Sequence, residues 1–149
     1  MGKGEPIDIP AGLMVEMGRI ATDCWPQECC GLLIGLKDTP DCIMRFVAAV
    51  NIAASPGTAF EIDPATLLAT HREVRTWGER IVGCFHSHPD APAIPSRTDL
   101  ARAEEPGFLW LIFASSAKGV RDAALFQRLP LTQDGVGDRY FIERPIRQG

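Results

Sequence analysis

The sequence predicts an α+β or mixed α/β fold with a largely antiparallel sheet. Apolar runs of strand length recur along the chain, and short turn segments join several of them, which favours antiparallel pairing. Segments with helical periodicity lie between those runs, so helices and strands belong to one mixed architecture. The 149 residues contain no internal repeat, low-complexity tract or linker. This length suits one ordinary domain, and we expect residues 1–149 to form it.

The first predicted helix covers residues 10–24. Pro10 suits the first helical position and Pro26 ends the helix. A stripe at helical spacing marks its buried face: Leu13, Met17, Ile20, Ala21 and Cys24. Residues 27–35 follow as a polar entry into an apolar strand. A turn over residues 37–41 then leads to a partner strand over residues 42–50, and the short connection favours an antiparallel pair.

A loop over residues 51–58 precedes the second predicted helix. Asp63 and Pro64 are the residue types of an N-cap and a first helical position, and Gly78 marks the end of the helix after residue 77. One face of this helix carries three residues at helical spacing: Leu67, His71 and Val74.

The central predicted strand covers residues 81–87, which begin with an apolar run typical of a buried strand. A stiff loop with three prolines follows over residues 89–95, and residues 96–105 form a short helix that a Pro-Gly pair halts. The remaining strands are predicted over residues 108–114, 120–129 and 139–143, with turns at residues 118–119 and 134–137.

Composition and charge exclude several classes of protein. Hydrophobic residues make up 46% and charged residues 23%, as in globular proteins generally, and the net charge of −4 offers no basic surface for nucleic acid. No apolar run approaches the roughly 20 residues that span a bilayer, and the first residues lack the apolar core of a signal peptide. The five cysteines are odd in number and contain no Cys-x-x-Cys pair, which disfavours a disulfide framework. We therefore expect a cytoplasmic protein with reduced cysteines.

The candidate chemistry begins with His86 and His88, which stand two apart at the end of the central strand. Residues two apart on a strand project from one face, so both imidazoles can point at one cation. Asp99 can supply an oxygen as the third ligand. Two histidines and a carboxylate, with the fourth position left to water, are typical of a hydrolytic zinc site. Ser96 and Asp99 also match a capping box at a helix start, an interpretation that needs no metal and can coexist with ligation.

Glu28 admits two interpretations. It can be a solvated residue between a helix-ending proline and a strand, or it can be a general base beside the metal. Zinc lowers the pKa of a bound water to about 7, and a carboxylate outside the ligand set can accept its proton and later pass it to a leaving amine. A glutamate on a neighbouring strand could reach that water.

Together, Glu28 and the segment His86-Ser87-His88-x7-Ser96-x2-Asp99 resemble the JAMM signature of the MPN-plus metalloproteases. The spacing fits at every position of the signature, and residues 30–35 look like the family's first core strand. The length and the order of elements are similar to those of the short prokaryotic single-domain members. The resemblance implies a curved, largely antiparallel mixed sheet flanked by helices, a fold similar to that of cytidine deaminases.

The resemblance also implies a role for each signature residue. His86, His88 and Asp99 would bind one zinc ion (Zn2+), with water as its fourth ligand. Glu28 would be the general base and then the general acid. Ser96 would donate a hydrogen bond to the tetrahedral oxyanion.

The substrate that the resemblance implies is a ubiquitin-like sulfur-carrier protein of the ThiS or MoaD type, cut at the amide bond after its C-terminal Gly-Gly. Glycine fits a narrow channel without side-chain clashes, and an extended tail can pair with a strand edge. We expect that groove near residues 54–62 and the loop 89–95. The chain lacks room for the long insertions with which larger relatives bind ubiquitin, so a deubiquitinase-like isopeptidase is the weaker alternative.

Other functions stay open at this point. A non-catalytic MPN-type scaffold could hold a structural metal, although a scaffold needs neither Glu28 nor an open coordination site. A zinc deaminase requires His-x-Glu and Pro-Cys-x-x-Cys, which the chain lacks. A thiol hydrolase would use Cys30 or Cys84, and Cys84 could also compete as a soft metal ligand or pack in the core. His71, on the apolar stripe of its helix, fits the edge of the core better than a metal site.

Overall fold

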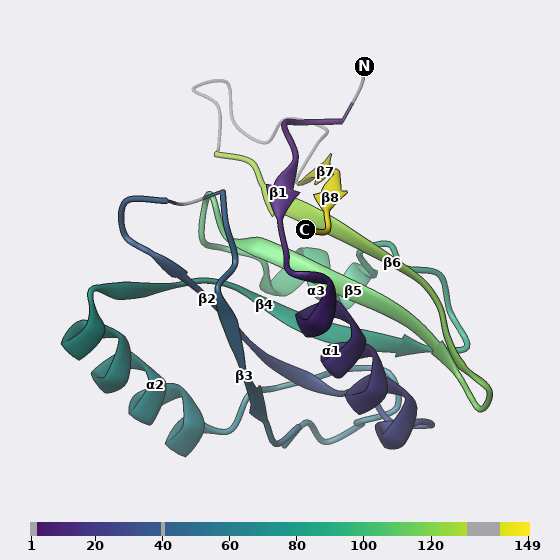
Figure 1. Ribbon diagram of the computed structural model, residues 1–149. Coiled ribbons are helices and arrows are strands. Elements are labelled where there is room, and N and C mark those ends of the chain that lie inside the picture. The colour runs from purple at the N-terminus through teal and green to yellow at the C-terminus, as the bar shows by residue number, and fades with distance from the viewer. Residues whose placement is uncertain (1–2, 40, 131–140) are drawn as a thin grey trace.

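The computed structural model describes residues 3–39, 41–130 and 141–149. A six-stranded sheet with the order β3-β2-β4-β5-β6-β7 forms its centre (Figure 1). The elements follow one another as β1 (Ile7–Asp8), α1 (Ala11–Cys24), β2 (Cys30–Leu36), β3 (Arg45–Ala49), α2 (Pro64–Trp77), β4 (Glu79–Pro89), α3 (Arg97–Arg102), β5 (Leu109–Ser116), β6 (Gly119–Arg128), β7 (Phe141–Arg144) and β8 (Ile146–Arg147). Three parts of the predictions lie outside the described residues: the turn 134–137, the first two residues of the strand 139–143, and residue 40 of the turn 37–41.

The pairing of the strands confirms the predicted class. Four of the five pairs in the central sheet are antiparallel, and only β4 and β5 run parallel. β4 lies between β2 and β5, so His86 stands opposite Cys30 on one side and Ile112 on the other. The histidine-bearing strand is therefore an inner strand, held by a ladder along both sides.

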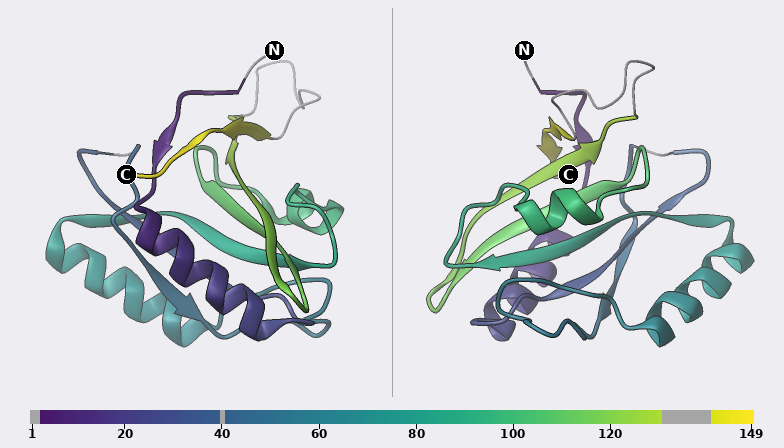
Figure 2. Two further views of the ribbon diagram at one scale, coloured as in Figure 1. Left: turned by 45° about the vertical axis from the view of Figure 1, so that its right-hand side comes forward. Right: turned by 180° about the vertical axis from the view of Figure 1, so that it is seen from behind.

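Different helices cover the two faces of the sheet (Figures 1 and 2). α1 buries Met17 in a cluster with Phe85, on the face away from the histidines. α3 lies across the opposite face, to which Cys84 points. α2 packs through Val74 against Leu32 of β2. None of the helices in the described ranges has the length and apolarity to cross a membrane.

The helix ends depend on their capping residues. Pro10 is the N-cap of α1 and lies just before the helix, so its predicted place as the first helical residue is wrong by one position. The predicted start and end of α2 are confirmed. The Asp63 side chain accepts a hydrogen bond from the backbone N–H of Thr66, and Gly78 ends the helix in the left-handed conformation with a φ of 68°.

Some predicted boundaries and positions differ from the structure. α3 ends at Arg102 and not at residue 105, and β3 begins at Arg45 and not at residue 42. The buried residues of α2 are Thr70 and Val74, so His71 is exposed and its predicted place at the core edge is wrong. Of the predicted face, Val74 is buried as expected, whereas Leu67 and His71 are exposed, because tertiary packing decides which side of the helix is covered.

The short parallel pair β1 and β8 was not predicted. Ile7 pairs with Ile146, and Asp8 pairs with Arg147, so the pair joins segments from the two ends of the chain. Two-residue strands carry no alternation to detect, and their partners are too distant in sequence for a hairpin signal.

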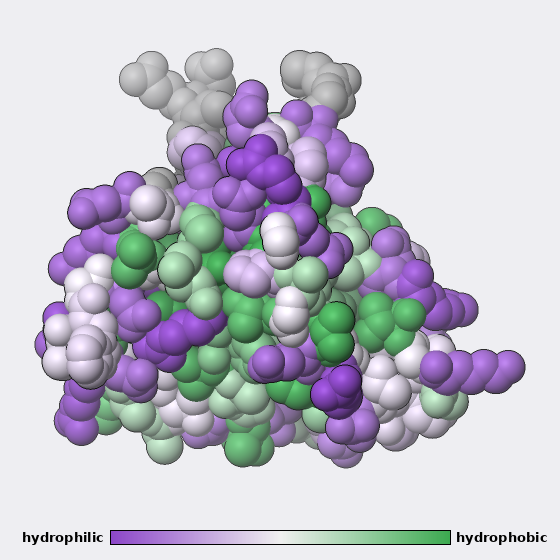
Figure 3. Space-filling model, viewed as in Figure 1, coloured by the Kyte–Doolittle hydropathy of each residue, from purple (hydrophilic) through white to green (hydrophobic). Residues whose placement is uncertain are grey.

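The face of the molecule that carries α1 has an apolar centre and a hollow beside the helix. Apolar side chains gather near the centre of this face, with polar ones around them (Figure 3). A hollow of about 530 Å³ lies between α1 and the β5–β6 hairpin, and its lining contains no histidine or cysteine. Both histidines of the candidate site lie on the opposite face, with Cys84.

Candidate metal centre

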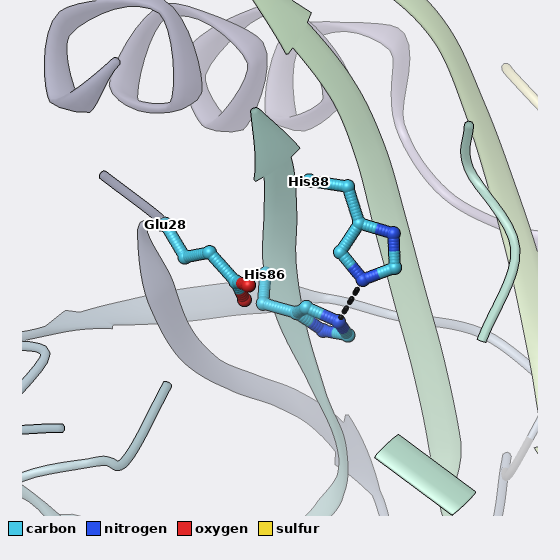
Figure 4. A group of neighbouring side chains, drawn as sticks. All are labelled: Glu28, His86 and His88. Carbon is cyan, nitrogen blue, oxygen red and sulfur yellow. Dashed lines mark hydrogen bonds between the residues drawn. The ribbon is translucent and has the colours of Figure 1, made fainter. Parts of the chain in front are cut away.

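The end of β4 places His86 and His88 on one face of the sheet, as the alternation of strand side chains predicts. Both side chains are buried, and their Nε2 atoms lie 3.0 Å apart. Figure 4 shows the two imidazoles turned toward each other, with Glu28 pointing toward them from the neighbouring segment.

α3 brings Asp99 to the same point. Its Oδ2 atom lies 3.1 Å from Nε2 of His86 and 3.1 Å from Nε2 of His88. The predicted capping box is also present, because the Ser96 hydroxyl accepts a hydrogen bond from the Asp99 N–H while the Asp99 Oδ2 accepts one from the Ser96 N–H at 2.9 Å. The cap therefore fixes the carboxylate beside the imidazoles, and the capping and ligand interpretations are compatible.

The three atoms that meet here suit a cation. His88 Nδ1 lies 2.9 Å from the Pro92 carbonyl, which can only accept, so the neutral ring carries its proton on Nδ1 and a lone pair on Nε2. His86 Nε2, His88 Nε2 and Asp99 Oδ2 form a triangle with edges of 3.0 to 3.1 Å. Ligands at about 2.0 Å around a tetrahedral ion are roughly 3.3 Å apart. The donor set and its spacing therefore fit a divalent metal.

Glu28 belongs to the same cluster but lies farther from its centre. One ligand atom from each of Glu28, His86 and His88 lies within 4.8 Å of the other two, a group that could itself hold a metal ion. Asp99 is closer to both imidazoles, at 3.1 Å. Asp99 thus completes the tighter set of three, and Glu28 stands beside it.

Burial is the main influence on the Glu28 carboxyl. The residue is 5% exposed, and its Oε1 atom has no hydrogen-bond partner among the described residues. Burial outweighs the attraction of His88 and raises the pKa of Glu28 to about 7. A carboxyl with this pKa can accept and release a proton near neutral pH.

Burial and mutual contacts shift the pKa of each member of the tighter set. Burial lowers the pKa of His86. Burial acts in the same direction on His88, but the hydrogen bond with Asp99 and the Pro92 carbonyl outweigh it and raise the pKa of that ring. Burial would raise the pKa of Asp99, yet the hydrogen bonds with the two histidines hold it well below its usual range. Asp99 is therefore an anion, as a metal ligand must be.

Two aromatic side chains hold the His86 ring, and the sequence did not reveal them. The Phe60 ring stacks on it with centroids 4.4 Å apart and an interplanar angle of 24°, and Trp110 meets it edge-on at 5.8 Å. Aromatic residues are common in cores, so nothing in the pattern marks these two as neighbours of the site.

The loop after His88 is anchored at Asp90. This residue has a positive φ of 56°, its N–H donates to the Ser115 carbonyl at 2.8 Å, and its carboxylate accepts from the Trp25 Nε1–H at 3.2 Å. These contacts hold the chain where the Pro92 carbonyl can accept a hydrogen bond from His88 Nδ1–H.

The cysteines on this face suit a role in core packing better than a role as nucleophile or metal ligand. Cys30 and Cys84 are almost fully buried, and both are free thiols. Burial raises the pKa of Cys30 to about 12 and holds the pKa of Cys84 well above its usual value. The thiolate is the nucleophile and the metal ligand, so burial disfavours both roles.

A cleft of about 190 Å³ opens beside the cluster. Its walls come from three parts of the chain: Glu28, then Gly57 and Thr58, and then His88, Pro89, Ala91 and Ser96. The segment 54–62 and the loop 89–95, predicted to border a groove, thus meet at one cleft that contains the candidate base and the candidate oxyanion donor.

The sequence matches one family model and is similar to several known proteins. Residues 10–127 match the family model described as prokaryotic homologs of the JAB domain, a range that contains every candidate site residue. A desampylase of Haloferax volcanii is 38% identical over 91 residues, which are 58% of this chain and 62% of the relative. A probable TtuB-protein conjugate cleaving protease of Thermus thermophilus is 32% identical over 95 residues, 64% of this chain and 62% of the relative. A CysO-cysteine peptidase of Mycobacterium tuberculosis is 36% identical over 100 residues, 66% of each chain. The chain thus spans about 62% of the first two relatives.

Solved structures share the fold. A protein of Desulfitobacterium hafniense superimposes with a TM-score of 0.78 at 30% identity, covering 96% of this chain and 92% of that one. A JAB1/MPN domain protein of Archaeoglobus fulgidus has a TM-score of 0.57 at 19% identity, covering 97% of this chain and 100% of that one.

Proposed function

The chain belongs to the family of prokaryotic JAB-domain homologs, and from that membership we propose that it is a zinc-dependent metallopeptidase acting on the tail of a ubiquitin-like sulfur-carrier protein. One observation carries the proposal. His86, His88 and Asp99 converge within 3.1 Å of one another, and the cleft beside them contains Glu28 and Ser96.

We assign His86, His88 and Asp99 as the ligands of one zinc ion. Two imidazoles favour zinc over magnesium or calcium, which prefer oxygen ligands. Zinc bound there would supply a Lewis acid for the scissile carbonyl and would lower the pKa of a water molecule. Burial of the three ligands keeps bulk water from competing for them.

We assign Glu28 as the general base and then the general acid. Its carboxylate accepts a proton from the water that attacks the scissile carbonyl carbon, and it returns that proton to the amine when the carbon–nitrogen bond breaks. The pKa of about 7 supports both transfers near neutral pH.

Ser96 is the proposed oxyanion donor. Its hydroxyl oxygen accepts a hydrogen bond from the Asp99 N–H, so the hydroxyl proton is free to point into the cleft. Such a donor stabilises the negative oxygen that develops during attack.

The proposed substrate is a carrier protein cut at the amide bond after a C-terminal Gly-Gly. A cleft of about 190 Å³, bordered by Gly57 and Pro89, suits glycine better than larger residues. Two relatives, the probable TtuB-protein conjugate cleaving protease and the CysO-cysteine peptidase, are named for cleaving adducts of the proteins TtuB and CysO. A cytoplasmic location completes the proposal, since five free thiols, three of them buried, suit a reducing compartment.

The test uses the zinc-loaded protein and two substrates followed by mass spectrometry. One is a sulfur carrier extended past Gly-Gly by a single cysteine, and the other is the same carrier joined through Gly-Gly to a lysine side chain of a peptide. We expect release of the carrier with a free Gly-Gly end from at least one of them, and loss of that release with a chelator.

The Glu28→Gln variant is the matched control for the assigned base. It should bind zinc as the wild type does and should release no carrier. Turnover by Glu28→Gln would disprove the assignment of the base. Both substrates left intact by the zinc-loaded wild type would instead favour a non-catalytic scaffold.

A further inference from the structure

We propose that Asn51 is a positioning residue that holds the backbone of Glu28 in place and joins it to the loop forming the opposite wall of the cleft. The proposal rests on the role of Glu28 as the base. None of the Asn51 side-chain hydrogen bonds in the described part of the chain goes to the imidazoles or to Asp99, so it would act on the reaction only through Glu28 and the loop.

Glu28 needs such support because it lies outside the sheet. β2 begins at Cys30, two residues later. The backbone pairing with β4 is incomplete at Cys29. Its carbonyl accepts a hydrogen bond from the Ser87 N–H at 3.3 Å, but its N–H donates to the Ser87 hydroxyl at 2.8 Å. The backbone groups of Glu28 itself must therefore find partners elsewhere.

Both partners of Glu28 come from the segment 51–61. Its N–H donates to the Pro56 carbonyl at 2.7 Å, and its carbonyl accepts from Asn51 Nδ2 at 3.0 Å. The segment 51–61 thus holds both backbone polar groups of Glu28, an arrangement we call the clamp. The same segment carries Phe60, whose ring stacks on His86.

The Asn51 amide uses its full hydrogen-bonding capacity. Nδ2 donates to the carbonyls of Glu28 and Ala59, and Oδ1 accepts from the N–H groups of Ala53 and Glu61, each at 3.0 Å. Rotating the amide by half a turn would set its oxygen against two carbonyls and its NH₂ against two N–H groups. One orientation is therefore fixed, and a carboxylate of the same shape cannot replace it.

The isosteric Asn51→Asp substitution tests the clamp. It keeps both acceptor contacts but loses both donors and places a charged oxygen against the Glu28 carbonyl. A displacement of about 1 Å can cost on the order of 10²-fold in rate, so we expect kcat at saturating substrate to fall by that order. The zinc affinity should stay that of the wild type, because the ligands are untouched.

A matched control separates positioning from general loss of stability. Val74→Ala removes a buried contact between α2 and β2, in a core cluster that contains neither Glu28 nor Asn51. It should lower Tm and leave kcat unchanged. An unchanged kcat in Asn51→Asp, or an equal fall of kcat in Val74→Ala, would overturn the proposal. If Asn51→Asp does not fold, Asn51→Ser takes its place with the same expectation, since its side chain is too short to span the four partners.

Amide hydrogen exchange gives a second readout that needs no activity. In the wild type the Glu28 N–H is protected by the Pro56 carbonyl, and loss of the clamp should speed its exchange while the amide of Leu111 in the sheet keeps its rate. Unchanged protection at Glu28 in the Asn51 variants would refute the clamp. A wild type without peptidase activity would refute the proposed function, and the exchange rates would still decide whether Asn51 holds Glu28.

Discussion

Among single residues, Glu28 combines burial with an oxygen that lacks a partner in the described part of the chain. Its pKa is 4.5 as the unshifted reference and about 7 in the fold. Between these values the folded state keeps a proton that the unfolded chain has released. The contribution of Glu28 to stability is therefore complete below pH 4.5 and is lost as the pH rises through 7.

The loss of this contribution with rising pH predicts how Glu28→Gln changes the stability of the metal-free protein. Glutamine does not titrate, so its stability relative to the wild type should increase from pH 5 to pH 8. This change in relative stability is at most about 3 kcal/mol, because each pKa unit corresponds to 1.36 kcal/mol, and contact of Glu28 with the open cleft reduces it. Thermal unfolding of both proteins with a chelator at the two pH values measures the change. If the Tm of Glu28→Gln minus the Tm of the wild type is constant with pH, or falls from pH 5 to pH 8, the burial of an ionisable Glu28 is contradicted.

Some residues of the candidate site are marked by a local sequence pattern, and others are not. His86, His88 and Asp99 could be predicted because strand alternation and a helix cap fix where their side chains point. Asn51 and Phe60 could not, since each acts through contacts between segments that no local pattern relates. The sequence thus yields the residues proposed to do the chemistry more readily than those proposed to position them.

Among the elements, α3 links a helix cap to the site through Ser96. The hydroxyl caps the helix, and in the proposed mechanism it also donates to the oxyanion. Replacing an N-cap serine by alanine costs about 0.5–2 kcal/mol, whereas glycine costs only a few tenths. Loss of an oxyanion donor costs about 10²–10³ in kcat.

Ser96→Gly and Ser96→Ala should therefore separate the two roles. Both should lose about 10²–10³ in kcat, but Ser96→Ala should have the lower Tm. Paired kinetics and thermal unfolding check this expectation. A kcat that follows Tm across the two variants would show that Ser96 acts only as a cap.

The parallel contact between β4 and β5 depends on Gly83. A Cβ atom there would fall on the carbonyl oxygen of Leu109, so no side chain fits between the strands. Gly83→Ala should lose roughly 1–3 kcal/mol, the usual cost of overpacking. Gly12→Ala is the control, because Gly12 lies in α1 with no atom within 4 Å of an added Cβ, and alanine there should gain roughly 0.5 kcal/mol. Urea unfolding of the three proteins measures both changes, and a neutral Gly83→Ala would contradict this packing.

The elements differ in how well the sequence predicts them. The strands β4 and β5 and the helix α2 could be predicted because the hydrophobic pattern of each segment agrees with the residues that begin and end it. The exposed position of His71 and the pair β1 and β8 were not, because packing against the rest of the molecule decides both.

For the whole molecule, metal binding and folding should be coupled. The three assigned ligands come from β4 and α3, which only the folded chain brings together. A ligand that binds the folded state alone stabilises it by about 2.7 kcal/mol at 100 times its Kd. Zinc should therefore raise Tm in the wild type and in Glu28→Gln, and should leave Tm unchanged in His88→Gln. Calorimetric scans with and without zinc test this, and an equal rise in His88→Gln would place the ion elsewhere.

The class of the fold follows from the sequence, but its topology does not. Hairpin connections indicated an antiparallel sheet, whereas the parallel step from β4 to β5 depends on a crossover through α3 that no local signal specifies. That step matters for the site, because the crossover returns Asp99 to the histidines. The expectation that residues 1–149 form one domain stays a prediction.

The most direct measurement is anomalous diffraction at the zinc edge from crystals of the zinc-loaded protein. We predict one peak bonded to Nε2 of His86, Nε2 of His88 and a carboxylate oxygen of Asp99, with the Glu28 carboxylate outside bonding distance. A peak bonded to Glu28 in place of Asp99, or to the sulfur of Cys84, would contradict the assignment of ligands and base.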